Sequence, residues 1–383
     1  MADFKNEYEY LIHLVKCAIN NIQPQEKPEN LSFEKVFEYG KIHEVGNIAF
    51  VSLQRLENKP DEEVFKKWKT FYAFSLSRHA NQLEVRKEIL ATFKKIGVRS
   101  LEAQGTVVKA FYPQPEWRMM TDIDFIIDRQ NLEKVNQVMQ NLGYKTKCSV
   151  NSNNVLFEVD VFGKYNTLIE IHSEFFERQN QESYGTITNP FETAEPTGEG
   201  LCYRLPDTEF YLFSLLHCIK HYLGKGAGIR RILDAYILKK QLYKKVDTEY
   251  VNSVLEKAGY LKTAEQIYAL ADKWFSSGEV CADLSAAEQL VFAAGNHGTG
   301  QIELSHEFEK SGKGNKLVFK LKKFFSRIFI SKAEIYSAYP FCRKHRYPLF
   351  LCWIHRILCL IFIKKKRKQA LNTISTIKDT QLK

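Results

Sequence analysis

Apolar residues recur at helical spacing over the first part of the chain, around Tyr10 and again around Trp68. The stretch 22–31 interrupts this pattern with two prolines and predicts a loop. A long helix is expected to continue through residues 83–95 and to stop at Gly97. The chain therefore begins with a helical region.

The pattern changes after Gly97. Alternation of apolar and polar residues predicts three strands, which are Thr121–Ile127, Val155–Phe162 and Thr167–His172. Between the first two strands, a helix with one apolar face is expected to begin with Asp128 as its cap and to end at Gly143. A strand, a helix and a hairpin in this order imply a small mixed sheet.

From Pro206 the pattern is helical again. One helix is expected up to Leu223 and a second over residues 229–242, joined by a flexible turn at 224–228. We expect an α+β fold in which a small mixed sheet is flanked by N-terminal and C-terminal helical regions. The expected parts are a helical region 1–80, a sheet core 81–200, a helical domain 201–300 and a basic, aromatic-rich helical tail 301–383.

Charge is distributed unevenly along the chain. The whole sequence has a net charge of +10, but the segment 313–368 alone holds 16 Lys and Arg with one acid, Glu334. The remainder holds 39 basic and 44 acidic residues and is mildly acidic. Any attraction to anionic partners is therefore expected in the C-terminal segment.

Three interpretations fit this basic segment. Residues 317–330 interleave bulky apolar and cationic side chains, and residues 349–363 are apolar except for His355 and Arg356. The second stretch is too short and too polar to span a bilayer, so an amphipathic helix on an anionic membrane surface fits better. A helical tail packed on the body is an equally simple interpretation. Binding to nucleic acid phosphates is favoured less.

Acidic residues occupy one face of two expected strands. Asp122 and Asp124 are separated by one residue, so both side chains leave the same face of their strand. The same alternation places Glu170 and His172 on one face of a later strand. If the two strands are neighbours, the three carboxylates converge.

Three converging carboxylates suit a particular chemistry. Hard oxygen ligands hold Mg²⁺, and two such ions about 4 Å apart support nucleotidyl or phosphoryl transfer. We expect two Mg²⁺ ions, with Asp122, Asp124 and Glu170 as metal ligands and catalytic residues. Two readings remain open: these acids can be exposed residues of an edge strand, and the pair Glu158 and Asp160 competes with Glu170 for the third position.

Several motifs now resemble one family. The sequence around the acids contains Gln104-Gly105, Tyr112-Pro113-Gln-Pro-Glu-Trp-Arg118 and Thr121-Asp122-Ile-Asp124-Phe-Ile-Ile. Downstream come Glu170-Ile-His172, His217-Cys-Ile-Lys220-His221, Gly228-Ile-Arg-Arg231-Ile-Leu-Asp234, Tyr339-Pro340 and Trp353-Ile-His-Arg356. Together, over about residues 83–360, they resemble the uncharacterised bacterial nucleotidyltransferase family common in polysaccharide-biosynthesis gene clusters. That family is similar in outline to the polymerase-β-like superfamily.

The resemblance implies roles for residues around the acids. It implies that Asp122, Asp124 and Glu170 bind metal, that Gly105 lets the backbone approach a triphosphate, and that Arg118 meets phosphate charge. The superfamily's Gly-Ser stands here as Gly105-Thr106, with a long spacer before Asp122. Where the family usually has Lys-Gly, this chain has Gln104-Gly105, which removes one phosphate-facing cation.

Further polar residues lie on the helices that follow. His217, Lys220 and His221 share one face of a helix, where they can contact a triphosphate or acceptor, chelate zinc, or pack against the sheet. Arg231 can reach the nucleotide. Arg230 and Asp234 are expected to form a salt bridge along the helix, because they are four residues apart. His172 is either a general base, a residue that orients a metal ligand, or a plain strand histidine.

The sequence thus predicts a Mg²⁺-dependent nucleotidyltransferase that moves a nucleoside monophosphate from an NTP to an unknown acceptor, such as a sugar or a lipid-linked glycan. The alternatives are an inert relative that binds a nucleotide or a partner, and an adaptor that acts through the basic tail. The N-terminus lacks the pattern of a secretory signal, and the eight scattered cysteines form no CxxC pair. A cytoplasmic protein, peripheral at the inner membrane face in one interpretation, is expected.

Overall fold

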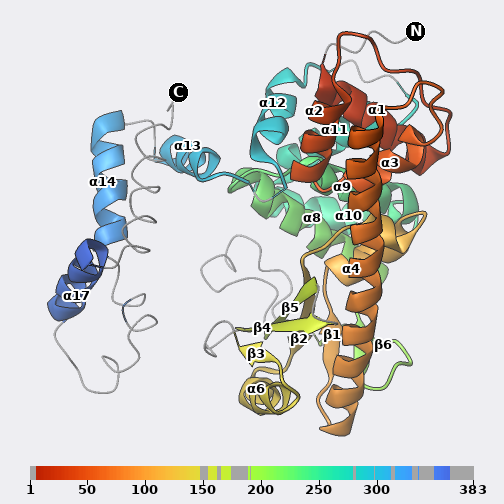
Figure 1. Ribbon diagram of the computed structural model, residues 1–383. Coiled ribbons are helices and arrows are strands. Elements are labelled where there is room, and N and C mark those ends of the chain that lie inside the picture. Colours follow the sequence, from red (N-terminus) through yellow and green to blue (C-terminus); the bar gives the residue numbers. More distant parts are fainter. Residues whose placement is uncertain are drawn as a thin grey trace. The chain divides into compact units, whose positions relative to one another are not determined.

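The structure is a computed structural model (Figure 1). It describes residues 6–146, 154–161, 165–173, 189, 191–278, 282–296, 298–311, 315–329, 335 and 349–362. Contacts divide the chain into two units, which are described separately. The first comprises residues 1–220 and 227–296, and the second comprises residues 221–226 and 297–383.

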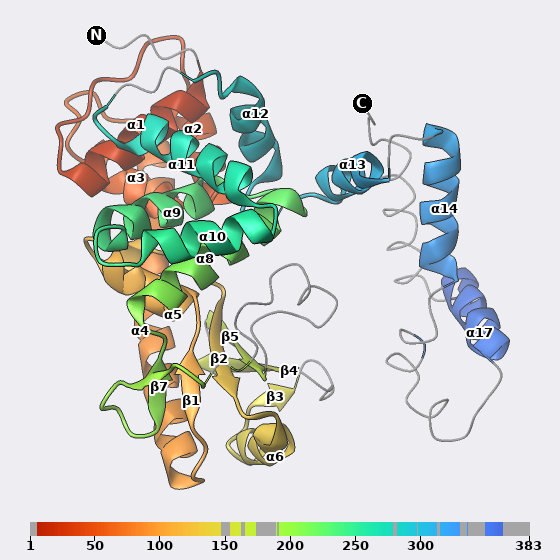
Figure 2. The same ribbon diagram turned by 180° about the vertical axis from the view of Figure 1, so that it is seen from behind.

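The first unit begins with helices, as the sequence predicts. They are α1 (Glu7–Asn20), α2 (Phe33–Ile42), α3 (Gly46–Leu53) and α4 (Glu62–Lys95). The predicted loop at 22–31 is confirmed, and α4 ends just before Gly97, whose φ is +67°. The 34-residue α4 is capped by Asp61, runs unbroken through residues 80 and 81, and extends beside the sheet in opposite views (Figure 1, Figure 2).

Seven strands form one mixed sheet, which confirms the expected fold class. Their order is β3-β4-β5-β2-β1-β7-β6. The strands are β1 (Ser100–Glu102), β2 (Asp122–Ile127), β3 (Lys145–Thr146), β4 (Asn154–Val161), β5 (Tyr165–His172), β6 (Glu195–Pro196) and β7 (Cys202–Arg204). Strands β2 and β5 are parallel neighbours, whereas β4–β5 and β1–β2 are antiparallel. The predicted turn at 163–166 lies partly outside the described residues.

Short elements connect these strands. Between β1 and β2 lie α5 (Gly105–Val108) and two 3-10 turns, η1 (Lys109–Phe111) and η2 (Pro115–Trp117). After β2 come the turn η3 (Arg129–Asn131) and α6 (Leu132–Asn141), which Gly143 follows as predicted. The predicted cap at Asp128 is wrong. Its carboxylate makes no capping bond and instead accepts two hydrogen bonds of 2.8 Å from Arg99 on the approach to β1.

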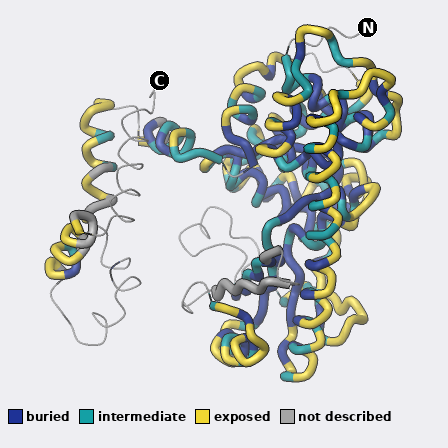
Figure 3. Tube along the Cα trace, viewed as in Figure 1, coloured by how far each residue is buried: buried dark blue, intermediate teal, exposed yellow. Residues whose placement is uncertain are grey.

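One face of the sheet is covered by helices. Phe93 of α4 and Met139 of α6 pack with Phe125 of β2 and Ile171 of β5 in a single buried cluster. This core shows as dark blue through the sheet (Figure 3). Because side chains alternate along each strand, burying these residues turns Asp124 and Glu170 to the opposite face.

The later helices of the first unit are α8 (Asp207–Leu223), whose last residues 221–223 are assigned to the second unit, α9 (Ile229–Leu242), α10 (Thr248–Lys257), α11 (Leu261–Phe275) and α12 (Ser285–Ala294). They pack against the N-terminal helices: the ring of Phe292 lies 4.3 Å from that of Tyr8 and 5.6 Å from that of Trp274. The helices before and after the sheet therefore build one body.

The second unit contains three described helices, which are α13 (Gly300–Lys310), α14 (Lys316–Ile328) and α17 (Leu349–Phe362). They lie in the C-terminal region for which the sequence predicts a helical tail. Within the part of the chain that the structure describes, no helix is both long and apolar enough to cross a membrane.

Candidate functional site

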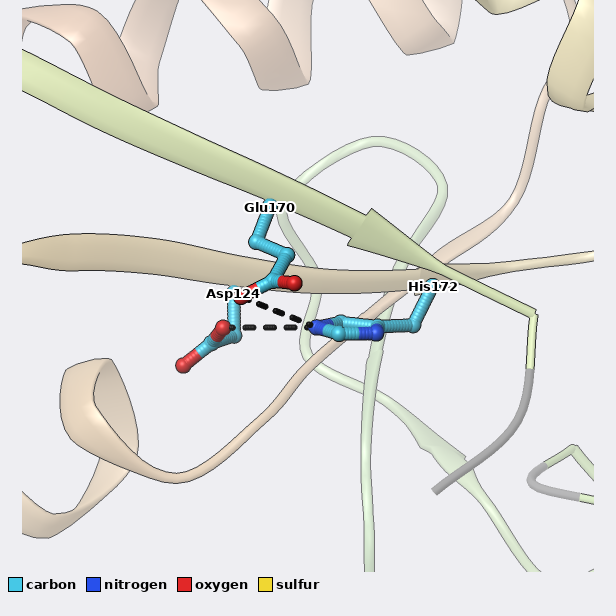
Figure 4. A group of neighbouring side chains, drawn as sticks. All are labelled: Asp124, Glu170 and His172. Atoms are coloured by element: carbon cyan, nitrogen blue, oxygen red, sulfur yellow. Dashed lines mark ion pairs between the residues drawn. The ribbon is translucent and has the colours of Figure 1, made fainter. Parts of the chain in front are cut away.

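The predicted acids meet on two adjacent strands. Strand β2 pairs with β5 so that Asp124 lies directly beside Glu170 and Ile126 beside His172. The side chains of Asp124, Glu170 and His172 point toward one another (Figure 4). Their ligand atoms all lie within 4.8 Å of one another, a spacing that can hold a metal ion.

The histidine sits between the two carboxylates. Its Nε2 lies 3.5 Å from Oδ1 of Asp124 and 3.7 Å from Oε2 of Glu170. All three side chains are between one fifth and one third exposed. Asp122, at the start of β2, is outside this tight group but close enough to act electrostatically on both Asp124 and His172. The cluster is thus accessible yet partly withdrawn from water.

Burial and crowding shift the pKa values of this cluster. Burial raises the pKa of Asp124 to about 6, and the charges of Asp122 and Glu170 add to the rise although His172 opposes it. Burial alone lowers the pKa of His172, but its hydrogen bond with Asp124 and the surrounding carboxylates outweigh this and raise it. Negative charge here lacks full compensation, and a divalent cation bound at these side chains would supply it.

The competing acids lie one strand further away. Strand β4 pairs Glu158 with Leu168 and Asp160 with Asn166, and β4 borders β5 rather than β2. Their side chains are outside the described residues. Of the candidates for the third acid, Glu170 is the one whose backbone pairs with Asp124.

The loop before β2 is held through its carbonyl groups. Asn47 of α3 donates to the carbonyl of Trp117 over 2.8 Å, and Gln82 of α4 donates to that of Met120 over 3.0 Å. Arg230 of α9 donates to the carbonyl of Met119. Buried polar side chains from three helices therefore fix the backbone that leads directly into Asp122.

Arg118 in this loop is engaged in a buried ion pair. Its guanidinium donates to both carboxylate oxygens of Asp234, over 2.8 and 2.9 Å, and to the carbonyl of Gly105. Tyr112 donates to the same carboxylate over 2.7 Å. Burial works against the charge of Asp234, but Arg118 outweighs it and holds the Asp234 pKa below its usual value.

The predicted pairing of Arg230 with Asp234 is wrong. Arg230 instead lies 3.1 Å from Glu44 and donates to Asn296, both of which are far from it in sequence. Asp234 pairs with Arg118 because the guanidinium donates two parallel hydrogen bonds to the two carboxylate oxygens. Arg230, four residues before Asp234 on the same helix, does not reach this geometry here.

The glycine turn beside the acids is tightly packed. A Cβ on Gly105 would lie 3.1 Å from a guanidinium nitrogen of Arg118, so a side chain there would press on the residue that pairs with Asp234. The preceding Gln104 adopts φ +46° and ψ −101°, which is strained for a residue with a side chain. The hydroxyl of Thr106 is buried without a hydrogen bond from the described part of the chain.

A pocket beside this turn gathers three predicted nucleotide-binding residues. Arg118, His217 and Arg231 line it, together with Gln104, Val108, Tyr211, Ser214, Leu215, Cys218, Asp234, Ala235, Leu238 and Tyr268. Lys220 and His221 lie on α8 but are not among its lining residues. The sequence thus indicated one wall of this pocket.

Three of the buried polar atoms that line this pocket have no hydrogen-bond partner among the described residues. In the region that the structure describes, Nε2 of Gln104, Oγ of Ser214 and Nε of Arg231 are buried without a hydrogen bond. Burial, with the nearby charge of Arg230, lowers the Arg231 pKa to about 10. Buried polar atoms usually have partners, so these three make the pocket a candidate place for a ligand or a water.

His172 and Ser214 are among the residues of the site that were not predicted site residues. His172 carried a signal, because it alternates with Glu170 on β5, and that alternation brings it into the acidic cluster. Ser214 carried none, because a serine within an apolar helix has no pattern that distinguishes a pocket wall from a buried contact.

Carboxylates on adjacent strands of a small mixed sheet, next to a glycine turn, are the features of a nucleotidyltransferase. The chain belongs to the family described as uncharacterised nucleotidyltransferase, whose profile matches residues 29–276. That span starts before α2 and closes at the end of α11, so it includes the sheet and most of the helical body. No curated protein and no solved structure matched the chain.

Proposed function

We propose that this protein transfers a nucleoside monophosphate from an NTP to an acceptor hydroxyl or phosphate and releases pyrophosphate. The observation that carries the proposal is the pairing of Asp124 with Glu170, with His172 between them, in a chain of the nucleotidyltransferase family. We propose a sugar or a lipid-linked glycan intermediate as the acceptor, following the gene-cluster association of the family that the motifs resemble.

In this proposal Asp122, Asp124 and Glu170 hold two Mg²⁺ ions through their carboxylate oxygens. Mg²⁺ held there would supply charge to polarise the α-phosphate and to neutralise the charge that develops on the pyrophosphate. A bond forms between the acceptor oxygen and the α-phosphorus, and the bond to the bridging oxygen of the β-phosphate breaks. Glu170 or His172 accepts the acceptor's proton, since both face the same spot.

The pocket beside Gly105 supplies contacts for the nucleotide. Arg231 is favoured over Arg118 as the residue that binds phosphate, because Asp234 already neutralises Arg118. His217 and the amide of Gln104 provide further polar contacts. In the proposal, Thr106, Lys220 and His221 also contact the triphosphate or the acceptor.

The test follows pyrophosphate release from each of the four NTPs with Mg²⁺ across sugar, sugar-phosphate and lipid-linked acceptors. Asp124→Asn and Glu170→Gln are expected to lower the rate by on the order of 100-fold or more while leaving the fold intact. Asp128→Asn is the matched control, because Asp128 directly follows the same strand but pairs with Arg99. Full activity in Asp124→Asn would exclude the proposed metal site.

A second experiment examines the pocket by titrating Mg·ATP. Arg231→Met keeps much of the side-chain volume but removes the charge, so binding should weaken by roughly tenfold or more. Arg129→Met, which removes an exposed arginine elsewhere in the sheet core, is the control and should bind as the wild type does. Equal affinity in both variants would remove Arg231 from the nucleotide site.

An inert relative that only binds a nucleotide or a partner is the second candidate. It is favoured by Gln104 in place of the family's lysine and by the neutralised charge of Arg118. Binding of Mg·NTP without turnover on any acceptor would support it. In that case Gln104→Lys should strengthen nucleotide binding, because the added ammonium faces the phosphates.

A further inference from the structure

The second unit presents two apolar helix faces to solvent. On α14, Leu317, Val318, Leu321 and Phe325 recur at i, i+1, i+4 and i+8 and so share one face. Leu317 is 66% exposed and Phe325 51% exposed. On α17, Phe350, Leu351, Ile354, Ile357, Leu358 and Phe362 repeat the same spacing and are also exposed. We call these two faces the apolar faces of α14 and α17.

The other side of α14 is packed, which fixes the direction of its apolar face. The ring of Phe319 lies 5.2 Å from that of Phe308 on α13, and Lys323 forms a 2.7 Å ion pair with Glu307. Helices α14 and α17 also meet, with the rings of Phe329 and Trp353 5.5 Å apart. The two helices therefore form one small assembly with α13, and the residues that make up both apolar faces are exposed.

Cations accompany the apolar faces. Helix α14 carries five Lys and Arg and no acid, and exposed Lys322 follows Leu321 directly. Five further basic residues, 364–368, follow α17 in the sequence. An exposed apolar stripe flanked by cations suits an interface between acyl chains and anionic headgroups.

We propose that α14 and α17 bind the surface of an anionic lipid bilayer through these apolar faces. Over its described residues α17 is shorter than a bilayer core, because 14 residues of helix extend only about 21 Å against a hydrocarbon core of about 30 Å. Nucleic acid would leave the leucine and isoleucine side chains uncovered. A second copy of this surface would bring like charges together. The proposal does not depend on the reaction, and the family match ends at residue 276, before α13 begins at Gly300.

The experiment uses the full chain and co-sedimentation with vesicles of phosphatidylcholine alone or with about one third phosphatidylserine. Binding is expected to the anionic vesicles, to weaken at high salt, and to be at least tenfold weaker on neutral vesicles. Leu321→Ser with Phe325→Ser should weaken anionic binding at least tenfold. Lys316→Gln with Lys322→Gln should also weaken it and should reduce its salt dependence.

The control makes the same chemical change outside this unit. Ile22→Ser with Leu142→Ser replaces two exposed apolar residues of the first unit and should leave vesicle binding unchanged. Lipids carrying a quencher in the acyl region should quench Trp353 in the wild type more than in the Leu321/Phe325 variant, with Trp353→Phe as the blank.

Several outcomes would overturn the proposal. One is wild-type protein that fails to sediment with anionic vesicles. Another is binding that the Leu321 and Phe325 substitutions leave unchanged. A third is a concentration-dependent dimer that those substitutions dissociate while lipid binding stays constant. Circular dichroism of each variant separates loss of binding from loss of structure.

Discussion

The acids on β2 and β5 and the pair of Arg118 with Asp234 are both withdrawn from water, yet their charges are compensated differently. Asp234 receives two hydrogen bonds from Arg118 and one from Tyr112, and its pKa lies below the usual value. Asp124 has other carboxylates beside it, and its pKa is raised to about 6. A carboxylate whose partners are complete stabilises the fold, whereas one whose partners are incomplete is available to a ligand.

The largest expected effect is on the compensated pair. Arg118→Met leaves Asp234 buried without its cation, which should lower the free energy of unfolding by about 3–5 kcal/mol. Denaturant unfolding followed by circular dichroism measures it. The double variant Arg118→Met with Asp234→Leu removes both charges and should recover much of the loss. A single variant within about 1 kcal/mol of wild type would show that the pair has little structural importance.

The next effect concerns the cluster of Asp124, Glu170 and His172 in the absence of metal, where the negative charge is only partly compensated. Because the folded-state pKa of Asp124 is about 6, above its ordinary value of 3.8, the folded protein binds this proton more tightly than the unfolded chain does. Asp124 therefore lowers the free energy of unfolding as pH rises from about 4 to about 6. Asp124→Asn should gain stability relative to wild type by roughly 1–3 kcal/mol across that window.

Denaturant midpoints measured in EDTA at several pH values test this difference. Adding Mg²⁺ at about pH 7 should reverse it, since the metal stabilises the wild type and not the variant. Below about pH 6, protonation of Asp124 should weaken Mg²⁺ binding. Parallel stability curves for the two proteins at every pH would contradict the uncompensated state of the cluster.

The smallest expected effect separates backbone strain at Gln104 from the loss of its side-chain amide, at the turn between the two clusters. Gln104→Gly removes the penalty of φ +46°, whereas Gln104→Ala removes the same amide but keeps a Cβ. The glycine variant should be more stable than the alanine variant by about 1 kcal/mol. Thermal unfolding of both proteins measures this. An alanine variant as stable as the glycine one would show that the turn relaxes without strain.

Local periodicity predicted most of the elements. The alternation in Asp122–Ile127 and the helical spacing in Leu132–Asn141 depend on neighbours a few residues apart, and both elements are present as expected. The same alternation assigned Asp124 and Glu170 to one face of their strands. Their contact depends on β2 and β5 being parallel neighbours, which the sequence allowed only as a condition.

Long-range partners were beyond this reasoning. Asp234 was paired with a residue four positions away on its helix, but its partner Arg118 is 116 positions away. Asp128 has the residue type of a helix cap, but its carboxylate is bound by Arg99, which directly precedes β1. In both cases a guanidinium brought near by the fold competes better for the carboxylate than the local partner does.

The loop before β2 is held by hydrogen bonds from Asn47, Gln82 and Arg230. These bonds limit how far the protein can be shortened from its N-terminus. Asn47 stands 70 positions ahead of the carbonyl that it binds, in a helix with no metal ligand of its own. A fragment that starts at β1 would retain every acid but lose two of the three anchors that aim them. A shortened protein that keeps its activity must therefore begin upstream of α3. A substitution at Asn47 should lower activity by displacing the acids of β2, although Asn47 itself binds no metal.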